Sequence, residues 1–428
     1  MQSAKEKTMF EHLVDSSFPK MVTIRQHFST PSIANVEEAV TREFNKPAIS
    51  SLIQPGARIA LLVGSRGIGR IDEIVKSAVR QVKDLGGVPF IVPAMGSHGG
   101  ATAQGQIDVL TRLGVTEEAV GAPIVSSMEP VELGLSSAGL PVYFDKNAAA
   151  ADGIIPIARV KAHTAFRYKC ESGMIKMLTI GAGKQMGAST LHSMFSVDGF
   201  GPLLYATYLQ VCSRLPVLFG LAIVENAYDQ PAIIEAVLQK DIEYREPELL
   251  KKAFEYMPKI PFKNFDVLIV DEIGKNISGD GMDPNVTGRY ATAIKGDMNY
   301  QRLVVLDLTP ETHGNALGIG MADVTTRKLV SQIDYQQGYM NAFTSKIVMD
   351  TVKVPMTLDS DKEAIAVALK TCVAVQPGLH KVVRIKNTLH LGELEISDTL
   401  LSEAKAMANI EIVGSPAEMK FDAQGNLI

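Results

Sequence analysis

The sequence predicts an α/β protein made of two α/β domains with a cleft between them, the first domain built on a mostly parallel sheet. Two observations favour this class. Apolar, strand-like runs alternate with segments of helical periodicity along most of the 428 residues. Loops rich in glycine and other small residues follow several of these runs, and open α/β sheets bind their ligands in such loops.

The first strand–loop–helix unit covers residues 59–85. An apolar run at 59–63 leads into glycines at 64, 67 and 69, and apolar residues then recur at helical spacing over 71–85. The glycine order is G-x-x-G-x-G, whereas a dinucleotide fold needs G-x-G-x-x-G and an acidic residue after the next strand. Because a glycine turn before a helix presents backbone N–H groups to an anion, we predict that this turn binds an anion or substrate and not NAD.

The remaining elements follow the same alternation. In the first domain the pattern predicts a strand at 88–93, a helix at about 103–113, an apolar segment at 153–157, a helix at about 200–214 and a strand at 217–224. In the second domain FDVLIVDEIG and QRLVVLDLT are typical of buried strands, and 321–333 and 360–373 of helices.

The domain boundary is predicted within YMPKIPFKNF, residues 256–265, where two prolines interrupt the periodicity. We therefore expect an N-terminal domain at 1–258, carrying the cofactor and catalytic loops, and a C-terminal domain at 259–406 that closes the cleft. The tail from about 407 to 428 has the alternation and the turn of a hairpin, and we expect it to return to the first domain.

The composition is that of an ordinary globular protein, with 46% hydrophobic residues, 21% charged residues and a net charge of −5. No block of Lys and Arg indicates a nucleic-acid surface. No apolar run reaches the ~18 residues that a membrane span needs, and residues 1–18 lack the apolar core of a signal peptide. The three cysteines form no disulfide framework or Cys-x-x-Cys pair. We expect a cytoplasmic protein that binds neither nucleic acid nor membrane.

Three loops of the first domain carry residue types that perform chemistry. Arg66 stands in the first loop, His98 in the second, and His163 in the third, which continues to Lys176 and His192. A single loop histidine is most often only hydrogen-bonded locally, but three of them in successive loops, with an Arg and a Lys, indicate a site. Histidine acts as base, acid or metal ligand near neutral pH, and a guanidinium binds a carboxylate through two hydrogen bonds.

The residue types alone leave two chemistries open. His98, His163 and His192 could supply the three protein ligands of a zinc hydrolase, although no closely spaced His pair provides the local geometry that such sites often use. Two histidines on opposite faces of a substrate could instead alternate as base and acid.

The order Arg66, His98, His163, Lys176, His192 resembles the nickel-dependent lactate racemase family. The resemblance spans most of the chain and is most specific over 163–192, where SGMIK ends at Lys176 and His192 follows after 192 − 176 = 16 residues, the family's separation. It implies a nickel pincer nucleotide, a pyridinium-3,5-bisthiocarboxylic acid mononucleotide with nickel, attached covalently at Lys176, and His192 as the nickel ligand. Sulfur donors with an imidazole suit a late divalent metal. The enzymes that make this cofactor are implied as partners.

The resemblance also implies a racemase or epimerase that acts on a small-molecule 2-hydroxy acid by hydride abstraction and return. In this interpretation His98 and His163 are the two acid/base residues, and Arg66 binds the substrate carboxylate. Cofactor-binding positions are assigned in the glycine turn and the lysine motif, at Gly67, Gly69, Ser172 and Gly173.

The sequence departs from the family pattern in both domains. Val63 stands where the family has an acid, and the stretch between His163 and Lys176, with the insertion at 164–171, is three residues longer. In the second domain, GDGMDPNVTGRY lacks the family's substrate-binding Gln and Lys, and Arg289 is the long cation left there, so we predict that Arg289 binds the substrate. The expected substrate is a hydroxy acid other than lactate. The alternatives are a metal-dependent, zinc-type hydrolase or lyase, and a noncatalytic relative.

Overall fold

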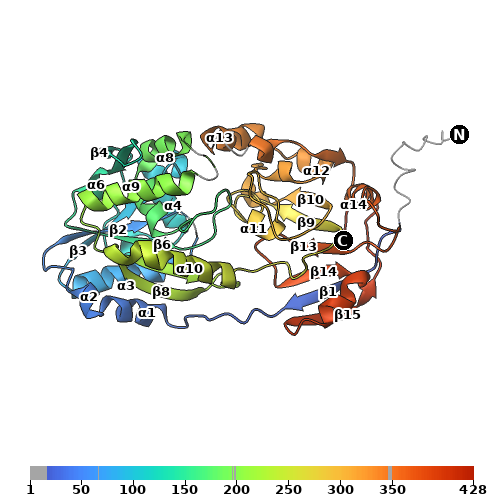
Figure 1. Ribbon diagram of the computed structural model, residues 1–428, viewed down its shortest axis with the longest axis horizontal. Coiled ribbons are helices and arrows are strands. Elements are labelled where there is room, and N and C mark those ends of the chain that lie inside the picture. The colour runs from blue at the N-terminus through green and yellow to red at the C-terminus, as the bar shows by residue number, and fades with distance from the viewer. Residues whose placement is uncertain (1–16, 66, 195, 197–198, 346–348) are drawn as a thin grey trace. The chain divides into compact units, whose positions relative to one another are not determined.

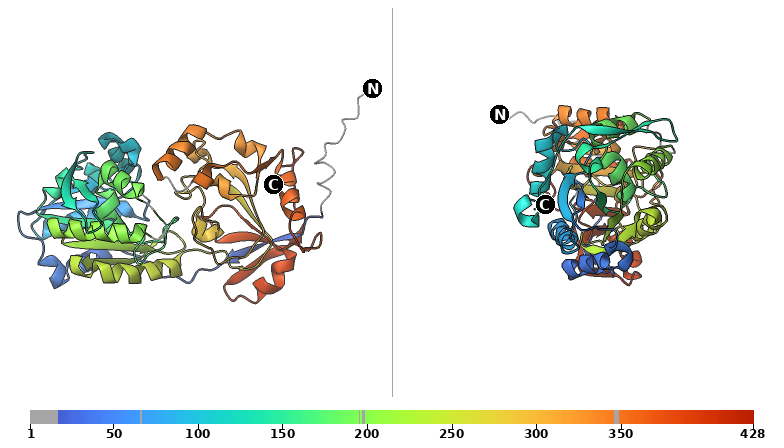
Figure 2. Two further views of the ribbon diagram at one scale, coloured as in Figure 1. Left: turned by 45° about the horizontal axis from the view of Figure 1, so that its top comes forward. Right: turned by 90° about the vertical axis from the view of Figure 1, so that its left-hand side faces the viewer.

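The structure is a computed structural model that describes residues 17–428 except 66, 195, 197–198 and 346–348 (Figure 1). The chain divides into two compact units. The N-terminal unit is Thr30–Met257, and the C-terminal unit combines Pro258–Ile428 with the segment that ends at Ser29. Each unit is an α/β layer structure with its own sheet, and Figure 2 shows both sheets from further directions.

The N-terminal unit is built on a five-stranded sheet in the order β3-β2-β6-β7-β8. Its strands are β2 (Arg58–Val63), β3 (Val88–Pro93), β6 (Gly153–Arg159), β7 (Phe219–Glu225) and β8 (Pro231–Leu238). The first four strands run parallel, and β8 runs antiparallel to β7. The parallel strands are almost entirely apolar and buried, as expected when helices cover both faces of a sheet.

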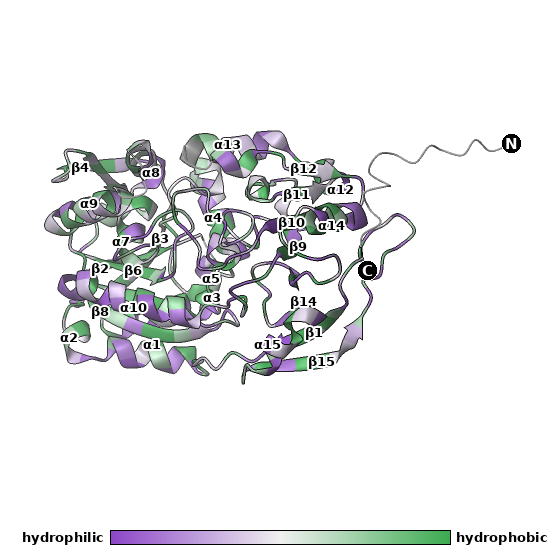
Figure 3. Cartoon of the chain, turned by 45° about the vertical axis from the view of Figure 1, so that its right-hand side comes forward, coloured by the Kyte–Doolittle hydropathy of each residue, from purple (hydrophilic) through white to green (hydrophobic). Residues whose placement is uncertain are grey.

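Both faces of this sheet carry a hydrophobic core. Successive residues of a strand point to opposite faces, so Leu61 joins a core with α1 (Val36–Phe44) and α3 (Ile71–Asp84), whereas Leu62 joins a core with α9 (Phe200–Arg214) and α10 (Ile242–Tyr256). The other helices of the unit are α2 (Pro47–Ser50), α4 (Ala103–Arg112), α5 (Glu117–Val120), α6 (Lys146–Ala149), α7 (Met174–Lys176) and α8 (Lys184–Ser193). Strands β4 (Pro130–Leu135) and β5 (Pro141–Asp145) form a separate antiparallel hairpin. Figure 3 shows the mixture of hydrophilic and hydrophobic residues along α10 that this packing requires.

The C-terminal unit is built on an eight-stranded sheet in the order β12-β11-β10-β9-β13-β14-β1-β15. Five neighbouring strands are parallel: β9 (Val267–Ile273), β10 (Arg302–Leu308), β11 (Val324–Thr326), β12 (Met356–Leu358) and β13 (Val382–Ile385). The sheet continues antiparallel through β14 (Glu393–Ser397), β1 (Met21–Gln26) and β15 (Ile410–Ala417). Its helices are α11 (Pro284–Thr287), α12 (Arg327–Val330), α13 (Tyr335–Ser345), α14 (Asp361–Lys370) and α15 (Leu401–Lys405).

Two expectations about the C-terminal part of the chain are wrong. Residues 321–333 form the short strand β11 and the single-turn helix α12 instead of one helix, because β11 pairs in parallel with both β10 and β12. The tail does not return to the N-terminal unit. Strand β15 pairs with β1 in the sheet of the C-terminal unit, and Phe421 and Leu427 pair across a turn.

Among the described residues, no helix is both long and apolar enough to cross a membrane.

Candidate functional site

Three loops leave the carboxyl ends of neighbouring parallel strands in the N-terminal unit. Strand β2 lies between β3 and β6, and the chain forms β3 on one side before it crosses to form β6 on the other. Parallel α/β sheets bind their ligands outside the carboxyl ends of the strands at such a reversal of strand order. The loops after β2, β3 and β6 carry Ser65, His98 and His163, so the predicted loops share one edge of the sheet.

The loop that carries His163 is closed at its base. The backbones of Lys161 and Ser172 exchange two hydrogen bonds, of 2.9 and 3.2 Å, which bring the two ends of the loop together. Inside the loop the buried carboxylate of Glu171 accepts hydrogen bonds from the backbone N–H of His163 at 2.6 Å and from Arg167 at 3.3 Å. Burial raises the pKa of Glu171. Ser172, which the sequence predicted to bind the cofactor, thus closes this loop through its backbone.

The ring of His163 is held in one tautomer. Its Nδ1 atom accepts a hydrogen bond of 3.0 Å from the backbone N–H of Ala165. Burial lowers the pKa of His163 well below its ordinary value, and the nearby ammonium of Lys176 lowers it further. The ring is therefore neutral at pH 7, and because Nδ1 is an acceptor, its hydrogen is on Nε2. In this state Nε2 is the nitrogen that can donate a hydrogen bond, and the ring accepts a proton only if Nδ1 releases the N–H of Ala165.

Aromatic rings connect His163 with His192. The ring of Phe166 lies 4.4 Å from His163 and 5.0 Å from Phe200, and Phe200 stacks on His192 at 5.6 Å with an interplanar angle of 17°. Lys176 and His192 both act electrostatically on His163. We call His163, Phe166, Lys176, His192 and Phe200 the histidine cluster. It brings together three predicted site residues that come from three segments of the chain.

Lys176 stands at the junction of two helical types. It ends the single α-turn α7 and precedes a π-helical turn at Met177–Gly181, in which the N–H of Ala182 bonds to the carbonyl of Met177. Single π-turns inside helices are frequent at functional sites. The side chain of Lys176 is half-buried beside Glu171 and His163.

The start of this helical segment is held by Glu246, a residue that the sequence reasoning did not single out. Glu246 comes from α10, is fully buried, and accepts the backbone N–H of Ile175 at 3.1 Å. A Cβ on Gly173 would lie 2.6 Å from its carboxyl carbon, so this close approach accounts for the glycine. Burial raises the pKa of Glu246 to about 7. The signal in the sequence that could have identified Glu246 is its position on the buried side of α10, four residues after Ile242.

His98 is exposed in the loop after β3. Its Nδ1 atom lies 2.5 Å from the hydroxyl of Ser65 in the loop after β2. The amide nitrogen of the buried Gln106 donates to the carbonyl groups of Gly96 at 2.9 Å and of His98 at 3.3 Å. The structure thus fixes His98 at the end of the strand next to β2, through contacts with α4 and with the first loop.

The glycine turn after β2, which contains Gly67 and Gly69, makes contacts with other segments of the N-terminal unit. The N–H of Gly69 donates to the carboxylate of Glu225 at 2.6 Å, and Glu225 also pairs with Arg159. A Cβ on Gly69 would lie 2.2 Å from the carbonyl oxygen of Asp229, whereas one on Gly67 would meet nothing within 4 Å. The N–H of Gly69 thus already binds a carboxylate of the chain, and the cofactor-binding roles of Gly67 and Gly69 stay predictions. Arg66 lies outside the described residues.

Arg289, predicted to bind substrate, makes contacts within the C-terminal unit. Its guanidinium pairs with Asp323 at 3.0 Å, donates to the carbonyl of Gln301 at 3.2 Å and lies 4.9 Å above the ring of Tyr300. These contacts tie the loop before β10 to the loop before β11. They give Arg289 a structural role, and its substrate contact stays a prediction.

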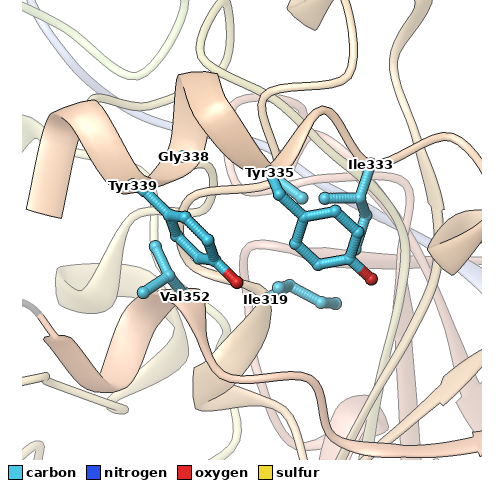
Figure 4. Close-up of a pocket in the computed structure, with 7 residues that line it drawn as sticks. Ile319, Ile333, Tyr335, Gly338, Tyr339 and Val352 are labelled. Carbon is cyan, nitrogen blue, oxygen red and sulfur yellow. The ribbon is translucent and has the colours of Figure 1, made fainter.

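A small hollow in the C-terminal unit does not provide a substrate site. It is lined by apolar and aromatic side chains between α13 and the segment around Ile319 and Val352, with Tyr335 and Tyr339 at its edge (Figure 4). Its free space of about 10 Å³ corresponds to roughly one water molecule. Small-molecule sites are larger by more than an order of magnitude.

The histidines that the structure describes do not form a metal site by themselves. Across the described part of the chain, no three His, Cys, Asp or Glu side chains are placed to hold one ion. A zinc hydrolase uses three such ligands. Cys170 is buried, and burial raises the pKa of its thiol to about 12, so the sulfur is protonated at neutral pH.

No protein-family model and no curated protein matches the chain. Among solved structures, a crystal structure of a Thermotoga maritima protein matches with a TM-score of 0.48 at 11% sequence identity, over 78% of this chain and 89% of that chain. The lactate racemase apoprotein from Thermoanaerobacterium thermosaccharolyticum matches with a TM-score of 0.45 at 12% identity, over 82% of this chain and 86% of that chain. Neither likeness decides the chemistry of this chain.

Proposed function

We propose that the protein is a racemase or epimerase of a 2-hydroxy acid other than lactate, and that it uses a nickel pincer nucleotide attached to Lys176. The observation that carries the proposal is the histidine cluster. His163, Lys176 and His192 are the residues to which the family resemblance assigns proton transfer, cofactor attachment and metal ligation, and both Lys176 and His192 act electrostatically on His163.

The charge and donor types of the cluster fit this group. Lys176, Lys161 and Arg167 all act as cations on His163, and such surroundings favour a ligand that carries a phosphate and thiocarboxylates. Lys176 would hold the group through its amine, and His192 would offer one imidazole to the nickel. When bound, the group supplies an acceptor for the hydride of the substrate α-carbon. A ligand that brings its own sulfur donors needs fewer protein ligands than a zinc ion does.

Two histidines would handle the proton of the substrate hydroxyl. His98 presents an exposed ring whose Nδ1 faces the hydroxyl of Ser65. When Nδ1 donates to that hydroxyl, Nε2 is the basic nitrogen that accepts a proton. His163 has its hydrogen on Nε2, because Nδ1 accepts from Ala165, and in this state it would donate a hydrogen bond, without transfer of the proton, to a substrate oxygen. A reaction of the other enantiomer through His163 as base requires release of the contact with Ala165.

The test is expression together with the enzymes that make the cofactor, followed by intact-mass measurement, peptide mapping and metal analysis. We expect added mass on the peptide that contains Lys176, about one nickel per chain, and epimerisation of at least one member of a panel of chiral 2-hydroxy acids. Lys176→Ala should abolish the added mass and the nickel. Lys169→Ala, which removes an exposed lysine of the loop that carries His163, over the ring of Tyr205, should retain both.

The outcomes separate the alternatives. Nickel that stays bound in Lys176→Ala would indicate a direct metal site and overturn the attachment. A loaded wild-type protein that epimerises none of the hydroxy acids would indicate a noncatalytic relative. Unmodified Lys176 in a preparation that still holds nickel would also contradict the proposal.

A further inference from the structure

A fully buried lysine connects the segments that carry His98 and His192. The ammonium of Lys184 donates to the carbonyl of Pro93 at 2.6 Å and to the side chain of Gln106 at 3.1 Å, and it pairs with the carboxylate of Asp145 at 3.1 Å. The side chains of Lys184 and Asp145 are both 0% exposed. Two of these contacts are hydrogen bonds, and the third is an ion pair with Asp145 Oδ2, a buried oxygen that has no hydrogen-bond partner.

Two of these partners, Pro93 and Gln106, connect Lys184 with the loop that carries His98. Pro93 is the last residue of β3, from which the loop with His98 starts. Gln106 accepts from Lys184 through its oxygen and donates through its nitrogen to the carbonyl groups of Gly96 and His98. The loop is also joined directly to the segment before Lys184, because the N–H of Gly96 bonds to the carbonyl of Gly181 at 3.0 Å.

The backbone of Lys184 leads to the histidine cluster. Lys184 is the first residue of α8, which carries His192. It lies midway between two predicted site residues, since 184 − 176 = 8 and 192 − 184 = 8. Its φ of +55° is in the left-handed region, where a lysine is strained by about 1–2 kcal/mol. Such strain persists only where the surrounding contacts determine the conformation, and it gathers at functional sites.

A charged residue at this place is costly to bury. A buried ion pair is often no more stabilising than an apolar pair of similar volume, and burial lowers the pKa of Lys184 despite its neighbour Asp145. An apolar side chain would fill the space, but it would not bind a carbonyl, an amide and a carboxylate that come from three different elements. The ammonium of Lys184 therefore fixes the orientation of these three groups and the distances between the elements that carry them.

We propose that Lys184 is a positioning residue that fixes the loop of His98 relative to the helix of His192, through Gln106 on one side and the start of α8 on the other. The catalytic meaning of this link rests on the proposed function. The link itself is a property of the apo chain and is measured without cofactor or substrate.

The experiment is hydrogen–deuterium exchange of the apo protein with the double variant Asp145→Asn/Lys184→Met. This variant buries no unpaired charge, and asparagine keeps the oxygen that accepts the N–H groups of Asn147 and Ala148 at the start of α6. We expect cooperative unfolding to be retained, while amides in 94–99 and in 185–192 exchange about tenfold faster or more, a local loss of about 1.4 kcal/mol in opening free energy. Wild-type protection in both segments would overturn the proposal.

A second variant keeps the test decisive if the first does not fold. Gln106→Leu carries no charge change and cuts only the branch toward His98, so exchange should rise in 94–99 and stay at the wild-type level in 185–192. Equal exchange of 94–99 in this variant and the wild type would overturn the link. As a control, Asp271→Asn/Arg384→Met removes the Arg384–Asp271 ion pair of the C-terminal unit together with the Arg384–Glu395 pair and should leave both segments unchanged.

Activity then separates this inference from the proposed function. In loaded enzyme, the double variant should lower kcat on the order of 10²-fold with KM nearly unchanged, because a small displacement of a reacting group costs rate more than binding. A wild-type enzyme without epimerase activity would contradict the function but not the exchange result. Faster exchange in both segments with unchanged kcat would show that the link does not position the catalytic residues.

Discussion

The Nδ1 atom of His163 accepts a hydrogen bond from the backbone N–H of Ala165, 3.0 Å away. One backbone amide thereby decides which nitrogen of a proposed acid/base residue carries the hydrogen. Burial of the ring first, and then the neighbouring charges beginning with Lys176, lower the pKa of His163 and keep the ring neutral. The two proposed acid/base histidines thus start from different states, with His98 exposed beside Ser65 and His163 held as a donor.

We expect nitrogen-15 NMR of the apo protein to show His163 as a neutral ring with its hydrogen on Nε2 at pH 7. The ring should remain neutral as the pH falls past 6.5, because its folded-state pKa lies well below that value. The variant His163→Gln identifies the resonance. A ring that is protonated at pH 6.5, or one with its hydrogen on Nδ1, would contradict the assignment.

Glu246 should give the protein a distinct dependence of stability on pH. Its pKa is about 7 in the folded chain, against an ordinary value of 4.5. Between these two pH values the folded chain therefore binds a proton that the unfolded chain has lost. The contribution of this proton to the free energy of unfolding is fully present below pH 4.5 and is lost as the pH rises through 7. Glu246→Gln stays neutral at every pH. Between pH 4.5 and 8 its free energy of unfolding should rise relative to the wild type by about 3 kcal/mol.

Urea unfolding at a series of pH values measures this difference. Glu248→Gln is the control, because Glu248 lies on the same helix but is exposed and pairs with Arg245. The control should follow the wild-type pH dependence through pH 7. A constant difference between Glu246→Gln and the wild type from pH 4.5 to 8 would mean that the Glu246 carboxyl does not titrate in this range.

The two glycines of the opening turn should respond differently to alanine. Gly69→Ala forces a methyl group against the carbonyl of Asp229 and should lower the free energy of unfolding by about 1–3 kcal/mol. Gly67→Ala meets open space and should change it by less than about 0.5 kcal/mol. Urea unfolding compares the pair. If Gly67 binds the cofactor, its variant should lose added mass at Lys176 while it keeps wild-type stability; full loading of that variant would remove Gly67 from the cofactor site.

Arg289 should behave as a structural residue of the C-terminal unit. Arg289→Ala removes the partly exposed pair with Asp323 and the stacking on Tyr300, and we expect a loss of about 1 kcal/mol in unfolding free energy. A double-mutant cycle with Asp323→Asn isolates the pair, because asparagine can still accept the N–H of Leu303. Additive effects of the two substitutions would show that the pair contributes nothing. A KM that is raised in Arg289→Ala but not in Asp323→Asn would support the predicted substrate contact.

Local patterns predicted many of the secondary-structure elements. Helix α3 covers 71–84 and was expected at 71–85, and β3 covers 88–93 as expected, because the spacing of apolar residues reports which side of an element is buried. The prediction failed where pairing decides the structure. Residues 324–326 form a strand because β10 and β12 lie on either side of them, and the tail joins β1 because only one side of β1 is paired with β14, so β15 can pair with the other side.

The sequence by itself determined the α/β class, the loops that follow the strands, and the order and spacing of Lys176 and His192, because all of these depend on residues close together in the chain. Only the tertiary structure decided which groups surround them. Glu246 reaches the helix of Lys176 across 71 positions, and Lys184 reaches Gln106 and Pro93 across 78 and 91. Contacts of this range form only when the strands have taken their order in the sheet and the helices have closed over it, so no local pattern in the chain encodes them.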